Sequence, residues 1–165
     1  MCVDQRILAI LILWIFLAAC QSTTEQPATK TAAQSEKPAA SADTRCISET
    51  PLPDDLKLLE PGPNVPKNVS QFAGKWMNGN WNGELCGALV VNNVTSEGDA
   101  EVIYSWGHGI SAAANYVTVD GKIKDGTLNI RLPWGTEAQY EMESPTVMTG
   151  KFFRNGVWTI SLEKQ

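Results

Sequence analysis

The sequence predicts an all-β protein, a small antiparallel up-and-down β-barrel of seven or eight strands, with no major helix outside the N-terminal segment. Apolar and polar residues alternate with a period of two in several short segments, which is the period of a strand that buries one face. Turn sequences rich in Gly, Asn and Asp separate these segments at short intervals. Closure into a barrel is expected because it removes exposed strand edges.

The segment from Phe72 to Val91 contains the clearest alternation. Every second residue from Trp81 to Val91 is apolar or glycine, and the opposite face carries Glu84 and Cys86. We interpret residues 81–91 as the first long strand of the domain.

The remaining strands are expected at short intervals along the chain. The two-residue turns Asp120-Gly121, Asp125-Gly126 and Asn155-Gly156 separate several of them, and Asn-Gly is a strong hairpin signal. The expected strands are 101–106, 115–119, 122–124, 128–132, 138–142, 147–154 and 157–163. A membrane-spanning barrel needs strands of roughly 9 to 11 residues, so a barrel with an apolar interior is preferred.

The N-terminus carries an apolar segment of a different kind. Residues 7–19 form a continuous apolar run after Arg6, too short to span a bilayer as a helix but typical of a signal-peptide core. The run ends in Leu17-Ala18-Ala19-Cys20, which resembles the lipobox of bacterial lipoproteins. This resemblance implies a signal peptide at 1–19 and an acylated Cys20 that anchors the protein to a membrane. Gln21 favours the outer membrane, facing the periplasm, by similarity to lipoprotein sorting patterns. An ordinary cleaved signal and an uncleaved anchor remain alternatives, because Asp4 offsets Arg6.

Composition divides the rest of the chain into three parts. Residues 21–45 contain no Val, Ile, Leu, Met or aromatic residue, so residues 20–45 are expected to be the lipidated cysteine and a disordered tether. Residues 46–68 are rich in proline and leucine and predict an ordered strap across the barrel exterior or one mouth. The barrel domain is expected at 69–165.

Two cysteines remain for the folded part. Cys2 lies in the leader and Cys20 is the acylation site, so Cys46 and Cys86 are expected to pair in an oxidising compartment. A closed loop of about 40 residues corresponds to roughly 4 kcal/mol at most. The alternative is two unpaired buried thiols.

One short motif links the domain to a known family. Phe72-x-Gly74-x-Trp76 resembles the opening of lipocalins and related calycins. The resemblance implies that Trp76 plugs the closed end of the barrel and stacks on Arg154. An eight-stranded barrel either fills with side chains or holds one small molecule, so both interiors remain open. Tyr104-Ser105-Trp106-Gly107 is also similar to uncharacterised secreted bacterial domains, which brings no function with it.

Residues able to do chemistry are few. His108 is the only histidine, and its glycine-rich surroundings give no carboxylate partner or oxyanion hole, so a loop histidine or a ligand contact is expected and an enzyme is not. We expect neither a metal nor a cofactor site, since no metal-ligand cluster or phosphate-binding loop occurs. A net charge of −5 argues against nucleic acid as a partner.

Aromatic residues supply the candidate binding site. Trp106 and Trp134 each precede a glycine at the end of an expected strand, where a barrel mouth would lie. Together with His108, Tyr116 and Tyr140 they are the candidate ligand contacts. The preferred hypothesis is a lipid-anchored envelope protein whose barrel binds a small apolar or amphipathic ligand. The alternative is a non-catalytic interaction or structural lipoprotein with a filled barrel that binds protein or glycan.

Overall fold

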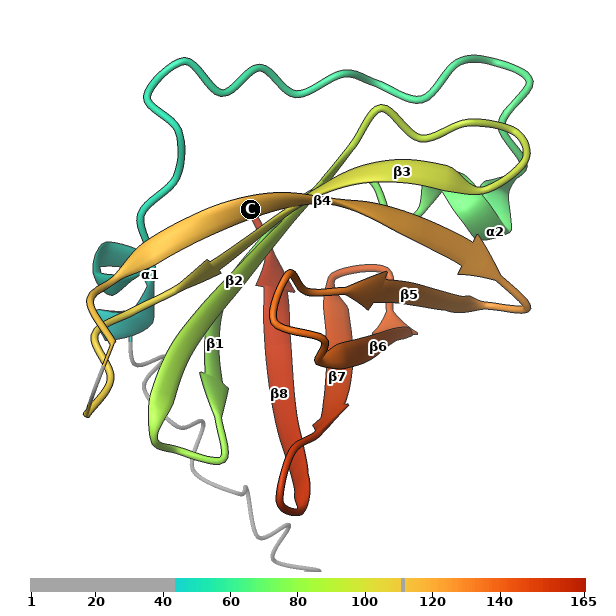
Figure 1. Cartoon of the computed structure of the whole chain (residues 1–165). Coiled ribbons are helices and arrows are strands. Elements are labelled where there is room, and N and C mark those ends of the chain that lie inside the picture. Colours follow the sequence, from blue (N-terminus) through green and yellow to red (C-terminus); the bar gives the residue numbers. More distant parts are fainter. Residues whose placement is uncertain (1–43, 111) are drawn as a thin grey trace, which may run out of the picture. The chain divides into compact units, whose positions relative to one another are not determined.

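Eight strands close into one antiparallel barrel in the computed structural model, which describes residues 44–110 and 112–165 (Figure 1). Each strand pairs with the next along the chain, and β1 pairs with β8 through Trp76–Lys164 and Met77–Glu163. The strands are β1 (Gly74–Trp81), β2 (Leu85–Asn92), β3 (Asp99–Trp106), β4 (Asn115–Lys124), β5 (Thr127–Arg131), β6 (Glu137–Ser144), β7 (Val147–Phe153) and β8 (Val157–Lys164). The predicted up-and-down barrel is therefore confirmed. The two helices of the described chain are short: α1 (Arg45–Glu49) and α2 (Lys67–Ser70).

One strand assignment and one turn assignment from the sequence are wrong. Residues 81–91 are not one strand, because Asn82 and Gly83 both have positive φ, 48° and 82°, and form the turn between β1 and β2. Asp120-Gly121 is not a turn, because β4 continues through it to Lys124. A Cβ on Gly121 would lie 2.7 Å from a Val102 side-chain atom, so the glycine allows close packing inside the sheet instead of a reversal.

The interior of the barrel is filled by large side chains. Trp81, Tyr140, Leu89, Leu128 and Met148 are each at most 1% exposed and belong to one core cluster. Inward-facing glycines make room for the rings: a Cβ on Gly150 would lie 2.5 Å from the Tyr140 ring. Of the two possible interiors of an eight-stranded barrel, this one is packed along most of its length.

The part of the strap from α1 to Leu59 crosses the outer wall of β2 and β3. Val90 and Ile103 face outward there and are buried, although they lie outside the interior cluster. The hydroxyl of Ser105 donates to the carbonyl of Pro51 at 2.6 Å, and Asn92 accepts from the amide of Leu59 at 2.8 Å. The strap therefore satisfies its own backbone groups with the side chains of the wall that it covers.

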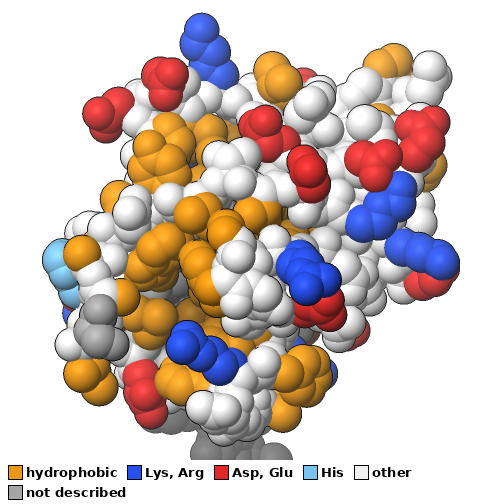
Figure 2. Space-filling model, in the orientation of Figure 1, with side chains coloured by type: hydrophobic (Ala, Val, Ile, Leu, Met, Phe, Trp, Pro, Cys, Tyr) orange, Lys and Arg blue, Asp and Glu red, His pale blue; other side chains and the backbone are white. Residues whose placement is uncertain are grey.

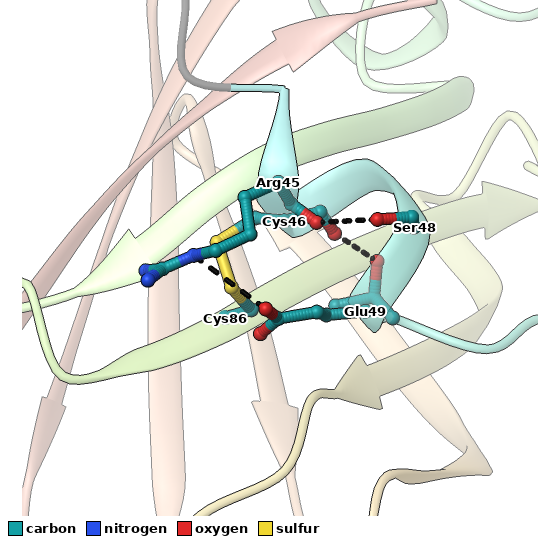
Figure 3. The surroundings of a disulfide bond; sticks show 6 residues. Arg45, Cys46, Ser48, Glu49 and Cys86 are labelled. Atoms are coloured by element: carbon teal, nitrogen blue, oxygen red, sulfur yellow. Dashed lines mark hydrogen bonds and ion pairs between the residues drawn. A yellow bond between two sulfur atoms is a disulfide. The ribbon is translucent and has the colours of Figure 1, made fainter.

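A disulfide bond ties this strap to the barrel. Cys46 in α1 bonds to Cys86 on the outward face of β2, with 5.0 Å between their Cα atoms (Figure 3). The hydroxyl of Thr50 donates to the carbonyl of Cys46 at 2.7 Å, and Arg45 pairs with Glu49 at 3.6 Å. The predicted Cys46–Cys86 bond is thus confirmed.

The α2 segment closes one end of the barrel. Val69 and Phe72 belong to the core cluster, and the Trp76 indole donates to the carbonyl of Phe72 at 2.7 Å. The ammonium of Lys164 lies 4.9 Å from the centre of the Trp76 ring, and burial lowers its pKa. Lys164 occupies the place expected for Arg154. The reason is direction, because Arg154 lies in the turn before β8 and Lys164 at the far end of that strand.

The signal peptide expected at 1–19, the acylated Cys20 and the tether to residue 43 lie outside the described residues. In the part of the chain that is described, no helix is both long and apolar enough to cross a membrane.

Candidate ligand-binding site

The end of the barrel opposite α2 carries a pocket of about 390 Å³. Up-and-down topology explains its position, because the β1–β2, β3–β4, β5–β6 and β7–β8 connections all lie at this end. Its lining residues come from these connections and the adjoining strand ends: Leu85, Tyr104, Trp106, Ala112, Leu132, Trp134, Thr136, Phe152 and Arg154. The space-filling view shows hydrophobic side chains gathered on one side of the visible face, with Lys or Arg side chains beside them (Figure 2).

Three aromatic rings form one wall of the pocket. The rings of Trp106 and Trp134 meet edge to face with 5.5 Å between their centres, and the Tyr104 ring lies 5.9 Å from Trp106 and 6.4 Å from Trp134. The Trp106 indole donates to the carbonyl of Ala113 at 3.0 Å, so its N–H is already used. Trp134 is 50% exposed, which leaves half of this side chain available to a ligand.

Phe152 separates the pocket from the packed interior. Its ring stacks on Trp158 with 5.6 Å between centres and lies 4.5 Å from the ring of Trp81. Trp81 is fully buried, and its indole N–H makes no hydrogen bond of good geometry in the described chain, although it lies close enough to the Tyr104 hydroxyl to lower the pKa of that group slightly. Beneath Phe152 the barrel is thus closed by Trp81 and, beside it, Tyr140 at 6.3 Å.

The pocket has a neutral floor over the physiological range. Burial raises the pKa of Tyr104 to about 12, with the neighbouring Trp81 indole acting weakly in the opposite direction. Burial also raises the pKa of Tyr140 well above its ordinary value. Both phenols therefore keep their protons at neutral pH and add no negative charge.

The structure separates the five candidate ligand contacts expected from the sequence. Trp106 and Trp134 are brought together at the mouth, as their positions before glycines indicated. Tyr140 is 1% exposed within the filled interior. Tyr116 lies on the outer wall, because it pairs with Ser105, whose hydroxyl contacts the strap. His108 is exposed in the β3–β4 connection and does not line the pocket.

Several lining residues were missed by sequence reasoning. Leu85, Leu132 and Phe152 were assigned to strands without a place at the mouth, and Arg154 was assigned to the opposite end. Strand order alone could have identified them. In an up-and-down barrel the first, third, fifth and seventh connections lie at the same end, so residues next to these connections meet at one mouth. The connections can be numbered in this way only if Asn82-Gly83 is recognised as the first turn.

The described residues hold no cluster of three His, Cys, Asp or Glu side chains with the geometry of a metal site. The mouth presents aromatic and aliphatic surface, the hydroxyl-bearing side chains of Tyr104 and Thr136, and one guanidinium at Arg154. Such a surface can bind and orient a small molecule.

Comparisons with known proteins give a limited result. No protein-family model matches the chain. No curated protein sequence matches it either. Among solved structures, a redesigned β-barrel is similar, with 17% sequence identity and a TM-score of 0.48, over 60% of this chain and 96% of that one. The closed eight-stranded barrel is established by the strand pairing of this chain itself.

Proposed function

We propose that this protein is a lipid-anchored envelope protein whose barrel binds one small apolar or amphipathic ligand in the pocket at its mouth. The pocket of about 390 Å³ is the observation that carries the proposal, because small-molecule sites fall in the range of roughly 300 to 1,000 Å³ and are lined mostly by apolar and aromatic side chains. The packed interior means that the ligand binds above Phe152 and not along the barrel axis.

The proposed membrane anchor depends on the N-terminal sequence. Leu17-Ala18-Ala19-Cys20 supports acylation of Cys20 and attachment to the outer membrane on its periplasmic side. The Cys46–Cys86 bond is consistent with an oxidising compartment of this kind. The resemblance of Phe72-x-Gly74-x-Trp76 to lipocalins supports the same class of binding protein and not an enzyme.

Binding can be tested with the neutral fluorescent probe N-phenyl-1-naphthylamine. The protein used is the full chain carrying Cys20→Ser, so that no acyl chain of its own competes for the pocket. The probe's emission should rise on binding, and Trp134→Ala should weaken binding by about five-fold or more because half of that indole faces the mouth. Tyr116→Ala is the matched control, since it removes a partly exposed aromatic ring from the outer wall. No binding, or equal loss in both variants, would contradict the proposal.

A second candidate function is the stacking of a glycan ring on Trp134. The 50% exposure of this indole favours it, because sugar rings stack on exposed aromatic faces. An oligomer of N-acetylglucosamine that displaces the probe, and loses this ability in Trp134→Ala, would support the glycan over the apolar ligand.

A further inference from the structure

The lining of the pocket carries positive charge and no negative charge. Arg154 is the single charged side chain among its described lining residues, and no carboxylate lines it. Arg154 lies in the β7–β8 turn, where its amide donates to the carbonyl of Gly156 at 3.0 Å and Asn155 and Gly156 have positive φ, 52° and 133°. The turn thereby fixes the backbone that carries the guanidinium at the rim.

Among the described residues, no ion pair or side-chain hydrogen bond engages the guanidinium of Arg154. In the chain as described, the ion pairs join Arg45 to Glu49, Lys122 to Asp99 and Arg131 to Glu137, and none includes Arg154. Its side chain is exposed, so it can form a two-pronged contact with an arriving anion without first breaking an existing pair.

The other polar groups of the mouth do not compete for that role. The Trp106 indole is committed to the Ala113 carbonyl, and the Tyr104 phenol is held neutral by burial. The remaining lining is uncharged: the hydroxyl of Thr136, the ring of Trp134, and the apolar side chains of Leu85, Ala112, Leu132 and Phe152. The site thus joins an apolar floor to a single cation at the rim.

The closed floor of the pocket determines how an amphiphilic ligand is oriented in it. Phe152 and Trp81 block the interior, so a bound molecule buries its apolar part against the aromatic wall and keeps its head at the rim beside Arg154. A cationic head there would meet the guanidinium with no carboxylate to compensate.

We propose that the mouth pocket selects amphiphiles with an anionic head, such as a carboxylate, which pairs with Arg154 while the apolar part packs against Trp106, Trp134 and Phe152. This inference rests on the proposed binding function and specifies the chemical class of its ligand.

The test compares three ten-carbon probes that differ in their head: decanoate, decanol and decyltrimethylammonium. Each is titrated against N-phenyl-1-naphthylamine bound to the full chain carrying Cys20→Ser. Decanoate should displace the dye at a concentration about ten-fold lower than decyltrimethylammonium, and added salt should reduce this preference because the pair is exposed. Arg154→Gln should weaken decanoate about five-fold or more while it changes decanol less than about two-fold.

Arg131→Gln is the matched control. Arg131 is also an exposed arginine near a strand end, but it pairs with Glu137 and does not line the pocket. It should leave all three affinities unchanged. If the three probes bind equally and Arg154→Gln affects none, the anionic preference is wrong while ligand binding stands. If neither the dye nor any probe binds, the proposed function fails and the inference fails with it.

Discussion

Two fully buried tryptophans differ in how their indole N–H groups are hydrogen-bonded. The Trp76 indole donates to the Phe72 carbonyl at 2.7 Å, whereas the Trp81 indole makes no hydrogen bond of good geometry in the described chain, with the Tyr104 hydroxyl as a nearby but poorly aligned acceptor. A buried donor without a good partner costs about 1 to 3 kcal/mol. Replacing Trp81 by Phe removes this donor, and that gain offsets part of the packing energy that the smaller ring loses.

Trp76→Phe should therefore lower the free energy of unfolding by about 1 to 2 kcal/mol more than Trp81→Phe does. Loss of the contact between Lys164 and the Trp76 ring adds to the same difference. Equilibrium unfolding in urea measures both variants against the parent. Equal losses, or a larger loss in Trp81→Phe, would show that the Trp81 indole is satisfied, by the Tyr104 hydroxyl or by a buried water.

Tyr104 gives a prediction for alkaline pH. Its pKa is about 12 in the folded state and ordinarily 10.0, so the folded state retains a proton that the unfolded chain releases. The stability that this group contributes is fully present below pH 10 and is lost as pH rises toward 12. Tyr104 alone should lower the free energy of unfolding by about 2 to 3 kcal/mol across this window, and Tyr140, whose pKa burial also raises, adds to the fall.

Tyr104→Phe should flatten part of that decline, as measured by urea unfolding at pH 8 and pH 11. Tyr116→Phe, on the outer wall, is the control. A decline of equal steepness in parent and Tyr104→Phe would contradict the assignment of this effect to Tyr104.

At the scale of single residues, alternation predicts which side of the sheet a residue faces only when the register is known. Trp106 and Trp134 could be placed at a mouth because each precedes a glycine at a strand end. Tyr116 and Tyr140 have similar local sequences, yet one lies outside the barrel and the other in its core. Whether Tyr116 faces inward or outward depends on its pairing with Ser105 on the neighbouring strand, and the local sequence does not determine that pairing.

At the scale of elements, turn dipeptides are ambiguous signals. Asn82-Gly83 forms a hairpin and Asp120-Gly121 lies within a strand, although both belong to the same class of turn sequence. The difference comes from packing, because Val102 and Leu128 occupy the space beside Gly121. The local sequence does not reveal that these two side chains pack against Gly121.

The strap is the element with the most easily tested contribution. The double variant Cys46→Ala/Cys86→Ala should lose about 2 to 4 kcal/mol of stability while its circular dichroism still reports a β-barrel, because the bond lies outside the core. Dithiothreitol should destabilise the parent by a similar amount and leave the double variant unchanged. An unfolded double variant would mean that the strap is required for barrel formation.

At the scale of the whole molecule, the barrel could be predicted because short alternating segments joined by tight turns have few other ways to bury their apolar faces. The filled interior could not, since it depends on Trp81 and Tyr140 fitting beside Gly87 and Gly150 on the neighbouring strands. The mouth pocket follows from both: topology gathers four connections at one end, and the packed rings set its floor.

The central claim is that a ligand occupies this mouth, and native mass spectrometry of the protein extracted in detergent from the membranes of the producing cell tests it most directly. The account predicts a reproducible non-covalent adduct on a chain whose mass begins at an acylated Cys20, with the adduct lost in Trp134→Ala and kept in Tyr116→Ala. A chain that carries no adduct, or an adduct that Trp134→Ala retains in full, would contradict it.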